Sequence, residues 1–110
     1  MKTTTVSKVL RVYIGENDIF SGGPLYGAIV ARLRDAGIAG VSVFHGIEGY
    51  GAHRRLHTQR LEVLFQGLPV VIEAVDTPEH IEQALATVET MDIEALVTVT
   101  DTTAIRYVKG

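Results

Sequence analysis

The chain has 110 residues, an ordinary apolar content and a formal charge of −3, which together indicate one globular domain. The slight negative charge argues against a general nucleic-acid-binding protein, and the absence of cysteine excludes disulfides and thiol chemistry. No apolar run reaches the roughly 18 residues of a membrane span, and the Thr-rich N-terminus lacks the apolar core of a signal peptide. We therefore expect a cytoplasmic protein.

The first half of the chain predicts a strand, a helix and a second strand. Residues 1–8 are rich in Thr and Ser, and we expect them to form a flexible N-terminus. Hydrophobic residues then alternate over Val9–Ile14, as in a half-buried strand. A proline suited to the first turn and apolar residues at helical spacing predict a helix over about Pro24–Ala36. A second strand is predicted over Val41–Ile47.

The second half predicts a strand, a helix and a final pair of strands. Leu68–Val75 is strongly apolar and predicts the third strand. Thr77 is a good N-cap for the second helix, with Pro78 at its first position. Alternation returns over Ala95–Thr100, and after a predicted turn at residues 101–103 a short strand is expected over Ala104–Val108.

This order predicts an α+β, ferredoxin-like βαββαβ fold with a short extra C-terminal strand, formed as a single domain by residues 9–110. Such a fold has one antiparallel sheet with both helices on one face. The other face would carry Tyr13 and Phe44 without cover. An apolar face of that size usually contacts a partner, so we expect this chain to self-associate.

The stretch from Gly46 to Thr58 is the best candidate for a functional site. Its three glycines, Gly46, Gly49 and Gly51, leave backbone amides uncovered, and cationic or titratable side chains follow at His53, Arg54, Arg55, His57 and Arg60. Amides beside arginines suit a phosphate or carboxylate. The alternative is a plain hairpin with a solvated basic tip.

The connection between the two central strands, residues 51–67, is long for a compact domain, and such loops are often functional. Its second limb, Leu61–Gly67, carries the apolar Leu64 and Phe65. The same limb matches the recognition site of 3C-type proteases. A native sequence and an engineered loop are both compatible with this match.

Other polar residues give weaker signals. His53 and His57 have zinc-ligand spacing only on a helix, and the neighbouring arginines would repel a dication, so we predict no metal site. His45 is either a hydrogen-bonded strand residue or the base of a small ferredoxin-like αβ-barrel enzyme. Glu16 and Asp18 form a solvated turn or an acid pair. We expect Glu73 to pair with Arg11 or Arg106.

No nucleophile, base and orienting group occur together, so we predict no catalytic residue and no enzyme.

Several short motifs resemble a family of PII-like proteins that forms a domain of unknown function. They are Arg-Val-Tyr-Ile-Gly-Glu at 11–16, Gly-Ile-Ala-Gly-Val at 37–41, Gly-Ile-Glu-Gly-Tyr-Gly-Ala-His at 46–53, Leu-His-Thr at 56–58 and Leu-Pro-Val-Val-Ile-Glu-Ala-Val-Asp at 68–76. The resemblance covers about Val9–Tyr107. More distantly, Gly49-Tyr50-Gly51 followed by His57-Thr58 resembles the start of the T-loop of PII signalling proteins.

The resemblance implies a homotrimer whose sheet faces pack around a three-fold axis. Small effectors, often adenine nucleotides, bind between subunits of PII relatives, and the T-loop, here about residues 51–67, docks on a partner. Family members are often encoded beside fluoride-exporting membrane proteins, so a membrane transporter is an expected partner. We predict no cofactor. A ligand-free structural trimer is a further alternative.

Carried over by position, Gly49 and Gly51 match glycines at the T-loop base, and Arg106 matches a C-terminal arginine that contacts phosphate. The predicted anion site therefore comprises Gly49, Gly51, Arg54, Arg55, His57 and Arg106. The predicted partner-binding loop residues are His53, Arg60, Leu64 and Phe65. The chain departs from PII proteins at Met91–Ala95, which has no glycine or lysine and carries two acids. If a nucleotide binds, we expect one less charged than a triphosphate.

Overall fold

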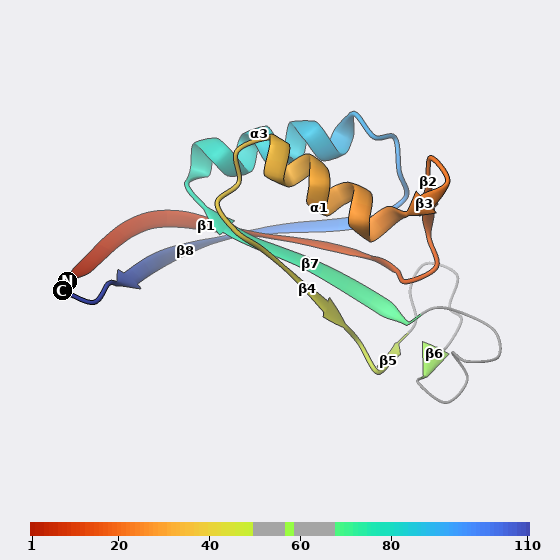
Figure 1. Cartoon of the computed structure of the whole chain (residues 1–110), viewed down its shortest axis with the longest axis horizontal. Helices are drawn as coiled ribbons and strands as arrows, with labels where there is room; N and C mark the ends of the chain where they lie inside the picture. The colour runs from red at the N-terminus through yellow and green to blue at the C-terminus, as the bar shows by residue number, and fades with distance from the viewer. Residues whose placement is uncertain (50–56, 59–67) are drawn as a thin grey trace.

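The computed structural model describes residues 1–49, 57–58 and 68–110. A four-stranded antiparallel sheet has the order β4-β7-β1-β8, and two helices cover one of its faces (Figure 1). The sheet strands are β1 Lys2–Gly15, β4 Val41–His45, β7 Pro69–Asp76 and β8 Leu96–Tyr107. The helices are α1 Leu25–Asp35 and α3 Pro78–Glu89. Two short ladders pair β2 Ile19–Phe20 with β3 Gly23–Pro24, and β5 Glu48–Gly49 with β6 His57–Thr58. The predicted α+β, ferredoxin-like fold is confirmed.

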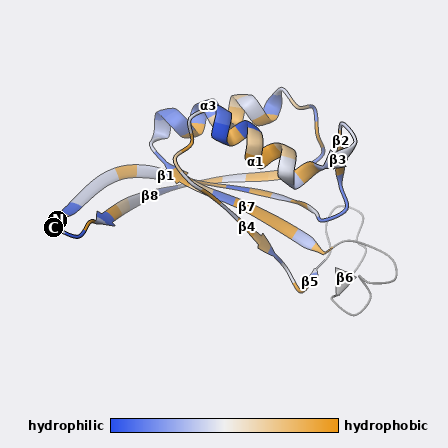
Figure 2. Cartoon of the chain, viewed as in Figure 1, coloured by the Kyte–Doolittle hydropathy of each residue, from blue (hydrophilic) through white to orange (hydrophobic). Residues whose placement is uncertain are grey.

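The core lies between the sheet and the helices. Alternate residues of the two central strands and one stripe of each helix are buried, as their periodicities predict. These side chains are Leu10, Val12 and Ile14 of β1, Val70, Ile72 and Ala74 of β7, Leu25, Ile29 and Leu33 of α1, and Ile81, Ala84 and Val88 of α3. Figure 2 shows the corresponding hydrophobic stretches along the strands and both helices.

The sequence marks the start of α3 with an N-cap residue and the end of α1 with a glycine. Thr77 caps α3, because its Oγ1 accepts a hydrogen bond from the His80 amide at 3.2 Å. Helix α1 ends in a Schellman motif, in which Gly37, at φ +92°, and Ile38 donate to the carbonyls of Arg34 and Leu33. The left-handed φ explains why glycine occupies position 37.

The structure differs from the sequence analysis near both ends of the chain. Lys2–Lys8, expected to be flexible, belong to β1 and pair with residues 101–107 of β8. Strand β8 runs without a break through residues 101–103, where a turn and a separate short strand were predicted. β-Branched threonines favour extended backbone, and the Lys8 Nζ to Asp101 Oδ1 ion pair of 3.0 Å joins the two strands.

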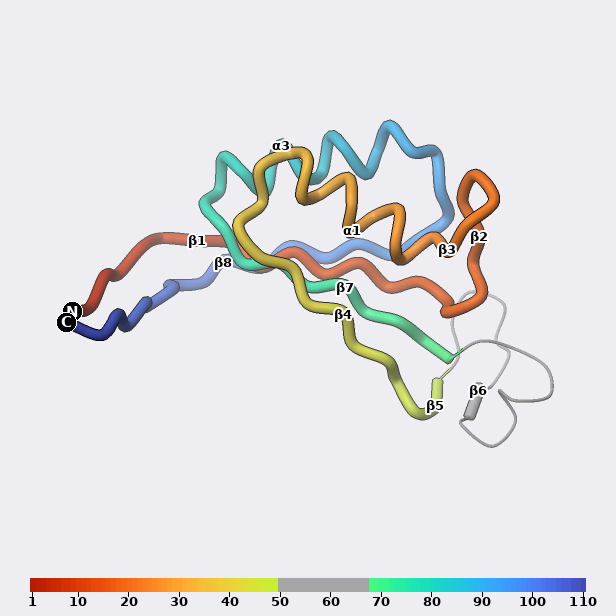
Figure 3. Tube along the Cα trace, in the orientation of Figure 1, coloured from red at the N-terminus to blue at the C-terminus, as the bar shows by residue number. Residues whose placement is uncertain are grey.

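The paired residues 2–7 and 102–107 form what we call the terminal ribbon, which projects beyond the helices (Figure 3). At its tip, the Met1 amino group donates to the Val108 carbonyl at 2.8 Å, and the Val108 amide donates to the Met1 carbonyl at 2.9 Å. The ribbon makes the protomer elongated, with a longest dimension of 49 Å.

Asp76 joins the end of β7 to the start of α3 and to the turn after α1. Its carboxylate accepts hydrogen bonds from the amides of Thr77 at 2.7 Å and Ala39 at 3.0 Å, and lies 2.8 Å from His80 Nδ1. The side chain is only 8% exposed. Burial raises the pKa of Asp76, but the hydrogen bonds from Ala39, His80 and Thr77 outweigh it, so the net pKa is lowered.

We expect Asp76→Asn to lower the free energy of unfolding at neutral pH by about 1–3 kcal/mol, because buried charge-assisted bonds are lost. Since folding lowers the pKa of Asp76, its contribution is present above the ordinary aspartate value of about 3.9 and is lost as the pH falls through the lowered value. Urea denaturation between neutral and acidic pH measures both effects. The control is Asp101→Asn, whose side chain is 87% exposed and should contribute little. Equal effects of the two variants would contradict the assignment.

Candidate functional site

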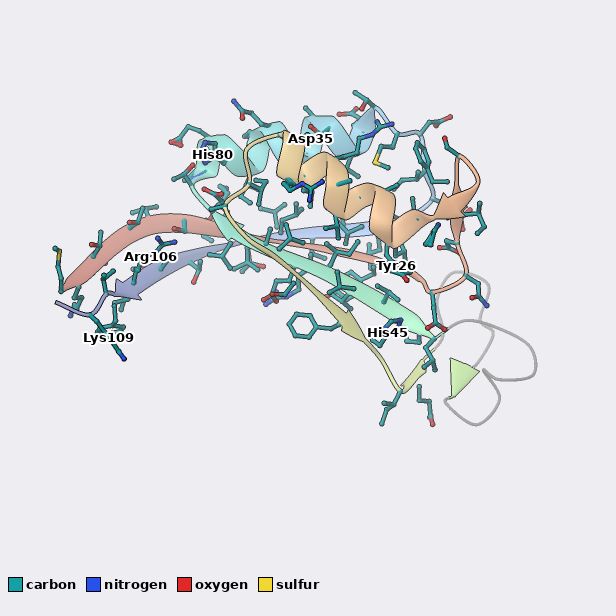
Figure 4. All side chains as sticks on the ribbon, viewed as in Figure 1. Tyr26, Asp35, His45, His80, Arg106 and Lys109 are labelled. Atoms are coloured by element: carbon teal, nitrogen blue, oxygen red, sulfur yellow. The ribbon has the colours of Figure 1, made fainter. Side chains whose placement is uncertain are left out.

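The predicted site residues that the structure describes lie at opposite ends of the protomer. Gly49 is in β5, next to the end of β4, whereas Arg106 is exposed on the terminal ribbon. Figure 4 shows His45 and Arg106 at the two ends of the sheet. The remaining predicted residues, Gly51, His53, Arg54, Arg55, Arg60, Leu64 and Phe65, lie outside the described residues, and for His57 only the backbone pairing with Gly49 is described.

The base of the 51–67 segment is built on a close contact between glycines and a proline. The Gly46 amide donates to the Pro69 carbonyl at 2.7 Å. A Cβ atom on Gly46 would lie 2.7 Å from Pro69 Cγ, and one on Gly49 would lie 3.2 Å from the same atom. The proline ring cannot swing away, so a side chain at position 46 would force the two strands apart.

Glu16, which follows β1, contacts the residues on either side of the 51–67 segment, Leu68 before β7 and His45 at the end of β4. Its amide donates to the Leu68 carbonyl at 2.8 Å, and its carboxylate accepts a hydrogen bond of 3.4 Å from the Leu68 amide. The other carboxylate oxygen lies 3.0 Å from His45 Nε2. The His45 ring also has an edge contact with the Tyr26 ring of α1, with centroids 6.2 Å apart. We call Glu16, His45 and Leu68 the loop-base clamp.

The pairing of Glu16 with His45 was not predicted from the sequence, which indicated a separate role for each residue. A topological signal was available, because β1 and β4 are both antiparallel to β7 and therefore run in the same direction. Glu16 follows β1 and His45 is the last residue of β4, so the two residues lie at the same end of the sheet. Asp18 has the predicted turn role, since its side chain accepts from the Gly15 amide at 2.9 Å.

The sheet face opposite the helices is uncovered, and the strand register arranges it in three rows. The first row crosses all four strands as Leu96, Tyr13, Val71 and Phe44. The second contains Thr98, Arg11, Glu73 and Ser42, and the third contains Thr100, Val9 and Val75. Leu96 is 63% exposed, Phe44 52% and Tyr13 39%. This is the apolar face that the sequence predicts.

Arg11 and Glu73 are the charged pair of the middle row. Arg11 Nε donates to Glu73 Oε2 at 2.8 Å, which confirms the predicted cross-strand pairing. Both side chains are partly covered, at 38% and 30% exposure. Among the described residues, these three rows hold one cation and one anion, so the face is apolar overall and electrically neutral.

The described residues contain no group of three or more His, Asp or Glu side chains arranged to hold a metal ion. Within residues 1–49 and 68–110, neither helix has the length and hydrophobicity needed to cross a bilayer.

Comparison with known proteins identifies the family. The DUF190 family, described as Uncharacterized ACR, matches residues 7–104, almost the whole chain. The chain belongs to the DUF190 family. A UPF0166 protein of Methanocaldococcus jannaschii is 37% identical over 98 residues, which are 86% of this chain and 88% of the relative. The family resemblance stated from the sequence motifs is thereby confirmed.

Solved structures show that this DUF190 protein has a PII-like fold. CPII of Thiomonas intermedia K12, a nitrogen regulatory PII-like protein bound to ADP, AMP and bicarbonate, aligns with a TM-score of 0.71 and 16% identity, covering 93% of this chain and 91% of CPII. A B. subtilis GlnK–ATP complex aligns with a TM-score of 0.55 and 11% identity, covering 88% and 82%. At these identities the likeness concerns the fold alone.

For the DUF190 protein we expect Gly46→Ala to destabilise the fold by about 1–3 kcal/mol, because the added methyl group meets the Pro69 ring and overpacks the loop base. Gly40→Ala is the matched control, since position 40 precedes the same strand and a Cβ there meets nothing within 4 Å. Thermal and urea unfolding of both variants test this. A destabilisation by Gly40→Ala as large as that by Gly46→Ala would argue against the glycine–proline contact.

Proposed function

We propose that this DUF190 protein is a cytoplasmic, trimeric PII-like regulator. In this proposal a small anionic ligand binds between subunits, and residues 51–67 transmit its presence to a partner such as a membrane transporter. The observation that carries the proposal is the PII-like fold, shared over 93% of the chain with a nucleotide- and bicarbonate-bound regulatory protein. The glycine-built loop base occurs in this fold at the start of the 51–67 segment.

The separation of the predicted ligand residues supports a site between subunits. Arg106 lies on the terminal ribbon, far from Gly49 in the same chain (Figure 4). One protomer therefore cannot bring the Arg106 guanidinium and the Gly49 backbone to one ligand. A second protomer can, if its ribbon reaches the loop base of the first. Amides and guanidinium groups together would then bind an oxyanion, and partial burial would strengthen each bond.

The turn after α3 favours a ligand of modest charge. Residues 91–95 carry Asp92 and Glu94, both exposed, and Asp92 has a left-handed φ of 52°. Two carboxylates here would repel a triphosphate placed nearby. CPII is described with ADP, AMP and bicarbonate, which are the classes of ligand we propose for this chain.

In this proposal His45 has a structural role in place of the catalytic one considered from the sequence. The imidazole Nε2 lies 3.0 Å from a Glu16 carboxylate oxygen, and the side chain is 46% exposed at the loop base. A general base needs access to a bound substrate at hydrogen-bond distance. His45 instead contacts the residue that holds Leu68, which supports a structural role in the loop-base clamp.

We expect the isolated protein to be a trimer that buries the uncovered sheet face, and Phe44→Glu to convert it to monomers at micromolar concentration. Burying a new, unpaired charge in an apolar contact is strongly unfavourable. Ile19→Glu is the control, because Ile19 is 67% exposed in β2, away from the sheet face. Sedimentation velocity measures the assembly. A monomeric wild type, or a Phe44→Glu variant as trimeric as the control, would contradict the proposed interface.

We expect Arg106→Ala to weaken ligand binding by about one to two decades, since a charge-assisted hydrogen bond contributes roughly 1.5–3 kcal/mol. Arg34→Ala removes the same charge from an exposed position on α1 and should leave affinity unchanged. His45→Ala should matter much less than Arg106→Ala. Calorimetry with AMP, ADP, ATP and bicarbonate provides the measurement. Absence of binding below millimolar concentration, or an unaffected Arg106→Ala variant, would overturn the proposed site.

A further inference from the structure

The terminal ribbon lacks the packing that normally stabilises β-structure. Residues 2–7 pair only with residues 102–107, because β7 pairs with β1 no further than Lys8. A two-stranded ribbon without a third strand or a helix against it is marginally stable in water. Both helices stop short of this segment (Figure 1).

One face of the ribbon is apolar and open to solvent. The register places Val6, Ile105 and Tyr107 on the same face, with exposures of 74%, 48% and 75%. This face continues the side of the sheet that the helices cover nearer the centre. Lys2, opposite Tyr107, lies on the same face, and residues 2–7 and 102–110 contain no Asp or Glu. This face of the ribbon therefore combines exposed apolar side chains with a positive charge near its tip.

A groove of complementary character lies between α3 and β8. It has a volume of about 470 Å³ and is lined by Glu82, Leu85, Ala86, Val88, Glu89 and Val97. Four of these side chains, Leu85, Ala86, Val88 and Val97, are apolar, whereas Glu82 and Glu89 are acids about two turns apart on the helix.

We propose that the terminal ribbon of one protomer docks in the α3–β8 groove of a second copy of this chain. The ribbon cannot reach the groove of its own protomer, because pairing with the rest of β1 and β8 directs it away from α3 (Figure 3). Apolar side chains of the ribbon would cover the groove floor, and Lys2, which the register places on the same face as Tyr107, would face Glu82 and Glu89. The contact joins two different surfaces, so repeating it around three protomers closes a ring.

This proposal rests on the self-assembly put forward under Proposed function and adds a second contact to it. In the proposed assembly the sheet faces would contact one another near the centre, and each ribbon would contact the α3–β8 groove of a neighbouring protomer. Docking would also bury the ribbon against three apolar residues of α3 and so supply the support that a two-stranded segment lacks.

The test is intermolecular disulfide crosslinking, which is unambiguous because the natural chain has no cysteine. Tyr107→Cys and Ala86→Cys are each exposed in the protomer, so neither change disturbs the core. The two single variants are co-expressed, purified together and oxidised, and crosslinked dimers are measured on a non-reducing gel. The control pairs Tyr107→Cys with Gln83→Cys, which is exposed on α3 but does not line the groove.

We expect crosslinked dimer to form with Ala86→Cys several-fold faster than with Gln83→Cys. Adding Lys2→Glu to the Tyr107→Cys chain should slow crosslinking, and adding Glu82→Lys to the Ala86→Cys chain should restore it. Equal crosslinking of the two pairs in a protein that sediments as a trimer would overturn ribbon docking while leaving the sheet-face trimer intact. Sedimentation of the wild type as a monomer would overturn both.

Discussion

Strand β1 is hydrogen-bonded along both of its edges, and the rest of the protomer depends on this central position. It pairs with β7 over residues 8–15 and with β8 over residues 2–13. Its side chains at Leu10 and Val12 are almost fully buried under the helices, while Arg11 and Tyr13 occupy the opposite face. One strand therefore supplies the core, the middle of the uncovered face and half of the terminal ribbon. Its last residue leads directly to Glu16 in the loop-base clamp.

The two faces of the sheet differ in the interactions that stabilise them. The covered face is apolar beneath the helices and is stabilised there mainly by burial of the core side chains. The uncovered face interrupts its apolar rows with the Arg11–Glu73 pair. In an assembly that buries this face, the pair would lose water, and desolvation would offset much of its Coulombic attraction. Because each charge already has its partner within the protomer, association would not leave an unpaired ion, and misaligned contacts with the pair would be penalised.

Much of the fold could be predicted because its signals are local. Alternation identified Val9–Ile14 of β1 and the first half of β8, an apolar run identified β7, and Thr77 and Pro78 identified the start of α3. The two differences near the chain ends involve pairing over a long sequence separation. Residues 2–8 have little apolar alternation, and residues 101–103 resemble a turn in isolation. Their extended conformation is specified by each other, across nearly the whole length of the chain.

The candidate site was predictable to a smaller extent for the same reason. The glycines at positions 46 and 49 were evident from the sequence, but their packing on Pro69 was not, because the proline lies on another strand. The pairing of Glu16 with His45 likewise requires the parallel relation of β1 and β4. Arg106 and Gly49 lie at opposite ends of the described protomer, so no contact within one chain links them and no local pattern in the sequence could reveal such a link.

The elongated protomer has a thermodynamic consequence for the proposed regulator. A ligand held by Arg106 of one subunit and the loop base of another would bind the assembled state more tightly than the separate protomers. By linkage, occupancy would then strengthen the assembly by the same free energy with which assembly strengthens binding. The loop base is suited to carry this coupling, because Gly46 and Glu16 hydrogen-bond directly to the start of β7. A shift of the loop base on ligand binding would therefore reach both ends of the 51–67 segment, because hydrogen bonds join the strands from which the segment leaves and to which it returns.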